Sequence, residues 1–354
     1  MGELTVKIKP LTPLWTGDEK RECNTLRETG IIGSLRWWYE ALIRGLGGSA
    51  CDPTNTTCDG KDHCAACELF GCTGWARKFR LEVESGKLAV IPEIKIGTRK
   101  KRVIRRREKY LIRNVKGLVA DRIVLKFILV RDITPNEWAL LNQTLQIIAD
   151  YGAIGAFTAQ GNGVIKIVEN NLPYRDIKPE NAILKKEGNT IKSPNLNDFF
   201  FYKFHIRFSE DIFNLINDEV FWTHQPDHHD FTDDWENWKK LWNDYHIIPI
   251  ACHIRDSIRH LESKRKRRHV IFGTGGKEAR SSKIFVSHGY KIDNKTIEIR
   301  ILGYDVEKDI QNKIKKELKN KLKEKLFSNG NQQYLERCIL KDEKSGRQLL
   351  EESK

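Results

Sequence analysis

The sequence predicts an α+β protein made of two sheet-and-helix domains. The chain has 354 residues, and a single domain commonly holds about 100 to 200. Hydrophobic residues make up 39% of the chain and charged residues 31%, as in a globular protein. In both halves, segments that alternate apolar and polar residues, as strands do, are interleaved with segments of helical periodicity.

The first half follows the order strand, helix, two strands, helix, strand. This is the order of the split βαβ or ferredoxin-like (RRM-like, βαββαβ) fold, in which two helices back a sheet. Ser34 is expected to cap the first helix and Gly47 to end it, while Thr134 and Glu137 form a capping box on the second helix. The predicted elements lie at residues 4–10, 34–48, 80–90, 124–131, 135–152 and 164–168.

A second set of elements follows in the other half. Residues 171–197 hold three prolines and many Asn and Lys residues, which is typical of a linker. A strand at 199–209 comes next, followed by helices at 210–219 and 249–268 and a two-stranded hairpin at 282–304. These elements predict a second sheet covered by helices.

Apolar residues recur at every fourth position from Val306 to Leu326, with Lys on the other faces. This pattern predicts a docked surface helix, with packing on a partner as a further option. The predicted divisions are an N-terminal domain at 1–170 with a cysteine-rich insertion at 49–74 and a basic segment at 99–118, a linker at 171–197, a C-terminal domain at 198–304, and a C-terminal helix and tail at 305–354.

The net charge favours a polyanionic partner. Lys and Arg number 62 and Asp and Glu 48, so the formal net charge is +14, which attracts nucleic acid or an acidic protein over long range. No apolar run reaches the roughly 20 residues that span a bilayer, and no apolar signal segment follows Met1. We therefore expect a cytoplasmic protein with no membrane partner.

The strongest electrostatic feature is the basic run at residues 99–109, with eight basic side chains and one acid. A charge run is commonly a solvated face, but cations this close repel one another unless phosphates or acids neutralise them. We interpret the run as a nucleic-acid contact. Its candidate RNA-binding residues are Lys100, Lys101, Arg102, Arg105 and Arg106.

The start of the first helix is a candidate phosphate site. Gly33 lets the backbone approach a ligand closely, and the unpaired N–H groups after Ser34 attract an anion. Arg36 lies at the flank of this turn, and Trp37 lies opposite the apolar stripe, where it can stack on a base. The alternative is an amphipathic core helix with ordinary caps.

Two glycine-rich loops extend this interpretation. The loop at 152–163 follows a helix, and its N–H groups can line a polyphosphate, although it can equally be a tight connection. It is neither a Walker loop nor a dinucleotide-binding fingerprint. The candidate residues are Gly152, Gly155, Gly161 and Gly163 in this loop, and Gly275 and Lys277 in the corresponding loop of the second half.

Aromatic residues beside basic ones are further candidates. Trp75 is followed by Arg77 and Lys78. Stacking on an unpaired base contributes about 1 to 3 kcal/mol. The alternative is that these aromatic side chains belong to the core, as most tryptophans do.

Five of the eight cysteines crowd into residues 51–72. In a cytosolic chain such a crowd is more often metal-binding or redox-active than a disulfide framework. Cys64 and Cys67 have the spacing of a zinc knuckle. The predicted structural zinc site consists of Cys51, Cys58, Cys64 and Cys67, with Cys72 and His63 as further donors. The alternative is a set of reduced, partly buried thiols.

The sequence carries no nucleophile elbow, HExxH motif or paired-carboxylate signature, so neither an enzyme nor a small-molecule substrate is expected. Asp18 is the one acid placed to meet a substrate at the first helix; otherwise it is a turn residue beside Gly17. The His and Asp residues at 224–234 can coordinate a metal, but we favour an exposed acidic loop.

Together these segments resemble the RAMP superfamily of CRISPR proteins, and most closely the family of the first-numbered RAMP subunit of the Cmr, or type III-B, effector complex. The resemblance covers nearly all of the chain up to about residue 304. It rests on LTPLWTGD at 11–18, ETGIIGSLRWWYEALIRGLGG at 28–48 followed by Cys51-Asp52-Pro53, CELFGCTGWARKFR at 67–80, YGAIGAFTAQGNGVIKI at 151–167 and IFVSHGY at 284–290.

The resemblance implies two ferredoxin-like RAMP domains in a crRNA-guided complex that recognises target RNA. In related backbone subunits, a glycine-serine turn and a basic residue of the first helix hold guide-RNA phosphates; here they correspond to Gly33, Ser34 and Arg36. The superfamily's glycine-rich loop corresponds to 152–163, although Asn162 stands where an aromatic residue is common. Target-cleaving subunits use an aspartate comparable to Asp18, but this subunit type is not the nuclease.

We therefore expect a non-catalytic RNA-binding subunit of a Cmr ribonucleoprotein that acts in antiviral RNA targeting. Its expected partners are crRNA, target single-stranded RNA near the guide's 3′ end, and other Cmr subunits. Structural zinc is the only cofactor expected. Two alternatives remain: a metal-dependent RAMP endoribonuclease that uses Asp18, and an assembly subunit with little RNA contact.

Overall fold

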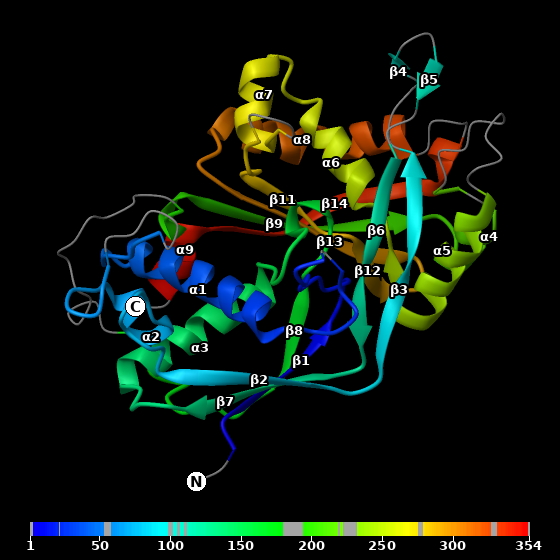
Figure 1. Ribbon diagram of the computed structural model, residues 1–354. Coiled ribbons are helices and arrows are strands. Elements are labelled where there is room, and N and C mark those ends of the chain that lie inside the picture. The colour runs from blue at the N-terminus through cyan, green and yellow to red at the C-terminus, as the bar shows by residue number, and fades with distance from the viewer. Residues whose placement is uncertain are drawn as a thin grey trace.

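The computed structural model describes residues 3–20, 22–52, 58–97, 102–104, 107–109, 112–179, 194–218, 220–221, 232–274, 279–326 and 331–352. Two antiparallel sheets alternate with two layers of helices (Figure 1). Helices of the first half lie between the sheets, and helices of the second half cover the outer face of the second sheet. None of the described helices has the length and apolar character needed to cross a membrane.

The first sheet has the strand order β2-β7-β1-β8, and all neighbouring strands are antiparallel. Helix α1 follows β1 and helix α3 precedes β8, so the four strands of this sheet and these two helices follow the predicted order, with further elements inserted between α1 and β7. The bounds are β1 Thr5–Pro10, α1 Glu28–Gly45, β2 Phe79–Ser85, β7 Ile123–Leu129, α3 Pro135–Asp150 and β8 Ile165–Asn170.

The ends of α3 follow from its sequence, but the start of α1 does not. The predicted capping box is present: the Thr134 hydroxyl accepts from the Glu137 N–H at 3.3 Å, and the Glu137 carboxylate accepts from the Thr134 N–H at 2.8 Å. The cap predicted at Ser34 is wrong, because α1 begins at Glu28. Ile31 and Ile32 are buried, and this packing outweighs the roughly 1 kcal/mol by which each helical glycine disfavours a helix.

The basic segment belongs to a long hairpin. Strands β3 (Leu88–Gly97) and β6 (Ile112–Ala120) pair with each other and extend toward the second sheet, where their buried side chains join its core (Figure 1). The short strands β4 (Arg102–Ile104) and β5 (Arg107–Lys109) pair at the tip. Lys100, Lys101, Arg105 and Arg106 lie outside the described residues, and of Arg102 only the backbone is described.

The second sheet repeats the strand order of the first. The order β12-β13-β9-β14 corresponds to β2-β7-β1-β8. In addition, β10 pairs with β12 and β11 pairs with β13. Residues 335–345, expected in a tail, instead form β14 and complete this sheet. The bounds are β9 Phe199–Phe208, β10 Ile247–Ile248, β11 Ile284–Val286, β12 Gly289–Asp293, β13 Thr296–Tyr304 and β14 Leu335–Ser345. Most of the predicted linker, residues 180–193, lies outside the described residues.

The helix predicted for the C-terminal region is present, but its apolar face is not free. Helix α8 (Lys308–Leu326) packs on α6 (Ala251–Arg259) and β14. Its apolar residues Ile310, Ile314, Leu318 and Leu322 are buried in the second core, as is Val306 just before the helix. The predicted docked surface helix is therefore confirmed, and these apolar side chains pack within the chain and not on a partner. The other helices are α2 Ala65–Phe70, α4 Ile212–Asn217, α5 Thr232–Tyr245, α7 Arg265–Phe272 and α9 Gly346–Glu352.

The first core cluster contains residues from both halves of the chain. Phe199 and Phe201 of β9 pack against Trp38 of α1, and Leu349 and Leu350 of α9 join the same cluster. On the other side, the His288 N–H donates to the Gly161 carbonyl at 3.1 Å. The face of the second sheet that is turned toward α1 is thus buried by the first half of the chain.

Two buried histidines make folding sensitive to acid. Burial lowers the pKa of His288 to about 3, and burial lowers that of His253 to about 4 against the opposing effect of Asp256. Both folded-state pKa values lie below the unfolded value, so the stability that the neutral histidines contribute is complete above about pH 6.5 and is lost as pH falls below it.

Urea unfolding at pH 6 and pH 5 tests this for His288. Between these two pH values, the free energy of unfolding of His288→Asn should fall by about 1 kcal/mol less than that of wild type. Equal losses would contradict a neutral buried His288.

Candidate functional site

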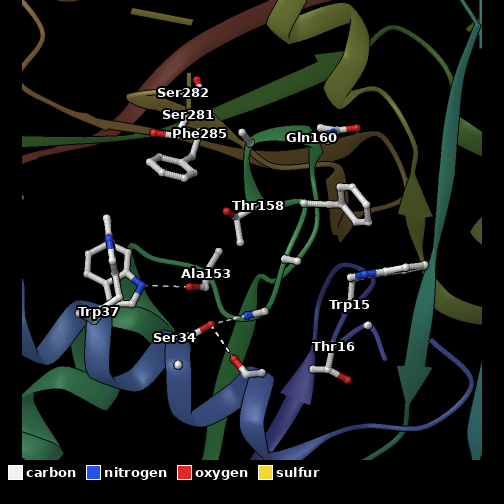
Figure 2. Close-up of a pocket in the computed structure, with 18 of the residues that line it drawn as sticks. Trp15, Thr16, Ser34, Trp37, Ala153, Thr158, Gln160, Ser281, Ser282 and Phe285 are labelled. Carbon is white, nitrogen blue, oxygen red and sulfur yellow. Dashed lines mark hydrogen bonds between the residues drawn. The ribbon is translucent and has the colours of Figure 1, made fainter. Parts of the chain in front are cut away.

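A groove of about 740 Å³ lies between the two halves of the protein. Figure 2 shows its walls: the loop before α1, the first turns of α1, the glycine-rich loop after α3, and the region of β11. Its lining residues are Trp15, Thr16, Gly17, Thr29, Gly30, Gly33, Ser34, Trp37, Trp38, Ala153, Gly155, Ala156, Phe157, Thr158, Ala159, Gln160, Ser281, Ser282, Phe285, Leu302 and Tyr304.

The lining is aromatic and carries no formal charge at any of these positions. Rings come from Trp15, Trp37, Trp38, Phe157, Phe285 and Tyr304, and hydroxyl and amide groups lie between them. Rings stack on flat, uncharged groups, and hydroxyls and amides can bond to the edges of such groups. The groove therefore suits unpaired bases, with phosphates left outside it.

Phe157 is the most exposed ring of the groove, with 39% of the residue accessible. Its ring meets Trp15 edge to face at 5.0 Å, and the Lys116 ammonium lies 4.6 Å from the centroid of Trp15. Phe157 has a φ of 58°, a left-handed conformation that costs a bulky residue of the order of 1 to 3 kcal/mol. The sequence analysis did not single out Phe157; its position between Gly155 and Gly161 was the available signal.

Trp37 lies where the helical periodicity placed it, opposite the buried stripe of α1. Its ring lines the groove and meets Trp38 at 5.0 Å and Phe285 at 6.1 Å, both edge to face (Figure 2). Trp37 therefore packs against the second half, as a core side chain would, and its ring also faces the groove, so stacking on a base stays a prediction.

The glycines of the 152–163 loop serve packing within the protein. A Cβ on Gly155 would lie 2.5 Å from the Trp15 carbonyl oxygen, and one on Gly163 would lie 2.3 Å from that of Ile154. A Cβ on Gly161 would meet the His288 ring at 2.5 Å. The N–H groups of Gly155 and Gly163 donate to the Ser34 hydroxyl and the Pro13 carbonyl, both at 2.8 Å. These two N–H groups, expected to line phosphates, are thus bonded internally.

Gly33 and Ser34 reach the groove from within a helix and not from its N-terminus. The Ser34 hydroxyl accepts from Gly155 and donates to the Gly30 carbonyl at 3.1 Å, which joins the helix to the loop (Figure 2). A Cβ on Gly33 would have no neighbour within 4 Å. The predicted anion site at a helix start is wrong here, but Gly33 borders open space in the groove.

Arg255 of α6 connects the two walls of the groove. Its guanidinium donates to the Ala159 carbonyl of the glycine-rich loop at 3.1 Å and to the Ser282 hydroxyl at 3.2 Å. It also donates to the Phe272 carbonyl at the end of α7 at 2.6 Å. Sequence reasoning missed Arg255, because only folding brings these three segments together.

Lys78 is a structural residue in a buried charge cluster. Its ammonium lies 2.8 Å from both the Glu137 and the Glu68 carboxylates. Burial lowers the pKa of Lys78, but the bonds to Glu137 and Glu68 outweigh burial, so the pKa is raised overall. Arg77 beside it is half-buried. The Trp75 ring also has partners within the protein, since it stacks on His63 at 4.5 Å and lies 4.1 Å from the Arg131 guanidinium.

Asp18 holds the turn in which it lies. Its carboxylate accepts from the N–H groups of Lys20 and Glu22 at 2.9 and 2.8 Å, and Arg27 approaches it at 3.8 Å. These bonds match the turn role considered from the sequence, and Asp18 is not among the lining residues of the groove. Gly275, Lys277 and most of the 224–234 segment lie outside the described residues.

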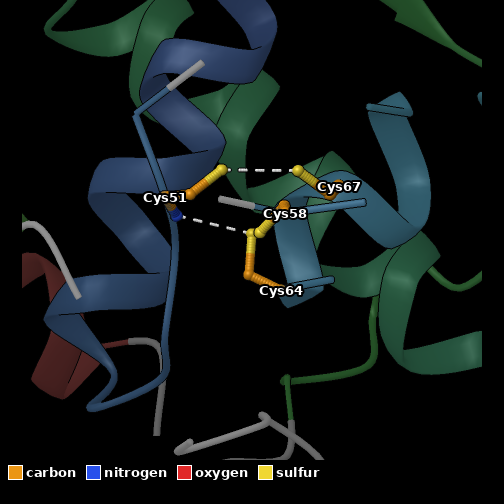
Figure 3. A group of neighbouring side chains, drawn as sticks. All are labelled: Cys51, Cys58, Cys64 and Cys67. Atoms are coloured by element: carbon orange, nitrogen blue, oxygen red, sulfur yellow. Dashed lines mark hydrogen bonds between the residues drawn. The ribbon is translucent and has the colours of Figure 1, made fainter. Parts of the chain in front are cut away.

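The four cysteines predicted as a metal site come together in the fold (Figure 3). The sulfur atoms of Cys51, Cys58, Cys64 and Cys67 all lie within 4.8 Å of one another. Their chemistry and number fit a tetrahedral divalent metal. Cys72 instead donates to the Asp59 carbonyl at 3.4 Å.

Arg36 points toward this cysteine cluster. Its guanidinium lies 3.1 Å from the Cys67 sulfur and 3.8 Å from that of Cys51, and it pairs with Glu40 at 2.7 Å. Burial raises the pKa of Glu40 to about 6, against the lowering effects of Arg36 and Arg44. Arg36 lies between the groove residues Ser34 and Trp37 in the sequence, but it is not among the lining residues of the groove.

Residues 7–166 match the family described as RAMPs, the RAMP superfamily. The match confirms the resemblance to this superfamily for the part of the chain that carries β1, α1 and the glycine-rich loop.

Among solved structures, the chain is similar to Cmr1 from Pyrococcus furiosus in its apo form, with 14% identity, a TM-score of 0.43, and coverage of 87% of this chain and 89% of that one. It is also similar to two chains from type III-B Cmr-beta structures bound to cognate target RNA, one of them with AMPPnP and in the presence of single-stranded DNA. Identities are 13% and 12%, TM-scores 0.40 and 0.39, and coverage 88% and 91% of this chain and 97% and 100% of those chains. No curated protein matches the sequence.

Lys78→Met tests the structural role of Lys78. We expect a loss of about 3 kcal/mol in the free energy of unfolding, because two carboxylates lose their buried cation. The neighbouring Arg77→Met should change stability by less than about 0.5 kcal/mol. Urea unfolding measures both effects. Unchanged stability together with weaker RNA binding would instead restore Lys78 as an RNA contact.

Proposed function

We propose that the chain is a non-catalytic, RNA-binding subunit of a type III-B CRISPR (Cmr) effector complex. The observation that carries the proposal is the uncharged aromatic groove between the two halves, bordered by Gly33 and by the glycine-rich loop. The RAMP match over residues 7–166 and the motifs shared with the Cmr subunit family support membership in such a complex. The strand order repeated in the two sheets supports two ferredoxin-like RAMP domains.

Bases and phosphates are recognised by different parts of the surface. Unpaired bases stack on rings such as Phe157 and Trp37, and the hydroxyl and amide groups around them bond to base edges. Phosphates remain outside, where the net charge of +14 and the basic hairpin segment attract them. The RNA is crRNA or the target paired with it near the guide's 3′ end, so base pairing with the guide supplies sequence specificity.

The described contacts favour this function over both alternatives. Asp18 is bonded to its own turn, which supports a structural residue over a nuclease ligand. The apolar face of α8, which had favoured an assembly subunit, is buried in its own core. Other Cmr subunits remain the proposed protein partners, and the cytoplasm the proposed location.

The four cysteines are proposed to hold structural zinc. Four thiolates fill a tetrahedral coordination sphere and leave no open position for catalysis. All four ligands belong to the cysteine-rich insertion at 49–74, so the metal would hold Cys51, which follows α1, to α2, which carries Cys67.

Phe157→Ala tests the stacking role of the groove. We expect about tenfold weaker binding of labelled single-stranded RNA, because one stacking contact of about 1 to 3 kcal/mol is lost. The plot of log affinity against log salt should keep its slope, roughly −0.7 per phosphate contacted, because the removed ring is uncharged. Fluorescence anisotropy in a salt series with Mg²⁺, followed by a gel, measures affinity and detects cleavage.

Phe213→Ala is the matched control, since Phe213 on α4 is 38% exposed against 39% for Phe157 and does not line the groove. Gly33→Leu adds an independent variant, because it projects into open space and improves helix propensity. Unchanged binding in both Phe157→Ala and Gly33→Leu would reject the groove as the RNA site. Cleavage that Asp18→Ala abolishes would establish the nuclease instead.

The purified protein is expected to contain a single zinc ion, which Cys64→Ser abolishes. Metal binding to the folded state alone stabilises it by about 4 kcal/mol when free zinc is about 1,000-fold above its dissociation constant. Thermal unfolding with and without a chelator, together with elemental analysis, tests this. A zinc-free protein of undiminished stability would favour the reduced-thiol alternative.

A further inference from the structure

The cysteine cluster is bordered by a buried guanidinium. Arg36 donates through Nη2 to the Cys67 sulfur at 3.1 Å and lies 3.8 Å from that of Cys51. Its other donors are bound as well, Nη1 to the Gly71 carbonyl and Nε to the Glu40 carboxylate, both at 2.7 Å. The Arg36 side chain is 14% exposed. Its position is thus set by four contacts that all lie at the cysteine cluster or on α1.

A second buried arginine continues this arrangement. Arg44 lies 3.6 Å from the other oxygen of Glu40, so Arg36, Glu40 and Arg44 form a row of alternating charges along α1. Arg44 also donates to the Ala50 carbonyl at 3.1 Å and to the Cys51 carbonyl at 2.8 Å. Both arginines therefore contact the segment that carries Cys51, one at its sulfur and the other at its backbone.

The charge balance of the row indicates what it is built to meet. Glu40 compensates one arginine, which leaves one positive charge without an anion in this set. Four neutral thiols would leave that charge uncompensated, which is unfavourable in a buried site. A divalent metal with four thiolate ligands forms a complex with two net negative charges. A guanidinium that donates to the sulfurs offsets part of that charge.

We propose that Arg36 is a positioning residue of the metal centre, the hydrogen-bonding counter-ion of an anionic tetrathiolate, and not a ligand of RNA phosphates. This inference rests on the proposed zinc site but not on the proposed RNA groove. It also gives α1 two functional faces. Arg36 contacts the cysteine sulfurs on one face, while Gly33 and Trp37 line the groove on the other.

Zinc affinity of Arg36→Met and Arg36→Lys tests the inference. Zn²⁺ competition with a chromogenic chelator should show about 10- to 100-fold weaker binding for Arg36→Met. Arg36→Lys should be intermediate, because one ammonium keeps the charge but cannot reach both the sulfurs and Gly71. Co²⁺ substitution supplies a second readout through the thiolate-to-metal absorption band. Arg80→Met is the matched control, since Arg80 is 61% exposed and pairs with Glu82.

RNA binding then separates the two roles of Arg36. Arg36→Met reloaded with excess zinc should bind single-stranded RNA with the affinity and salt slope of wild type. A phosphate ligand would instead reduce the slope by about 0.7 whether or not zinc is bound, and that result would overturn the inference.

The remaining outcomes are also distinct. Wild-type zinc affinity in Arg36→Met, or in Arg36→Lys where Arg36→Met does not fold, overturns the inference and leaves the zinc site standing. Failure of the wild-type protein to bind Zn²⁺ or Co²⁺ overturns both the site and the inference. The RNA-binding proposal has its own test in Phe157→Ala.

Discussion

The close packing of the glycine-rich loop against residues 12–16 is the constraint on which the groove depends. Gly155 and Gly163 have no side chain because carbonyl oxygens of their own chain occupy the space where a Cβ would lie. The loop is then held to α1 by the Ser34 hydroxyl and to the second half by His288 and Arg255. One short segment thus fixes both walls of the groove, and this packing allows Phe157 to remain in a strained conformation at the surface.

Helix α1 links the groove to the cysteine cluster. Its apolar stripe packs in the shared core, and its polar positions are divided between two sites. Ser34 and Trp37 face the groove, whereas Arg36, Glu40 and Arg44 form a buried row beside the cysteines. Because α1 carries both sets of contacts, a metal bound by the cysteines would also help to hold the helix that borders the groove.

The proposed recognition of a polyanion is divided between the groove and the charged surfaces. The lining residues that the structure describes carry no formal charge, although the whole chain carries an excess of 14 positive charges. A groove of this kind binds bases through stacking, which depends weakly on salt, while cations outside it bind phosphates in a salt-dependent way. Two cations that the sequence nominated already have partners within the fold, since Lys78 meets two carboxylates and Arg36 meets Glu40 and two sulfurs.

Most local elements and the four cysteines could be predicted from the sequence alone, whereas several rings of the groove, such as Phe157, could not. The capping box of α3, the order of elements in the first half and the four cysteines follow from spacing and periodicity, which are local properties. Only the tertiary structure decided how polar groups are used. Ser34 resembles a helix cap in the sequence, but the burial of Ile31 and Ile32 extends α1 beyond Ser34 toward its N-terminus. Arg36 resembles a phosphate ligand, but folding brings the cysteines next to its guanidinium. Likewise, β14 and Arg255 acquire their roles from partners more than 90 residues away in the sequence, which no local pattern encodes.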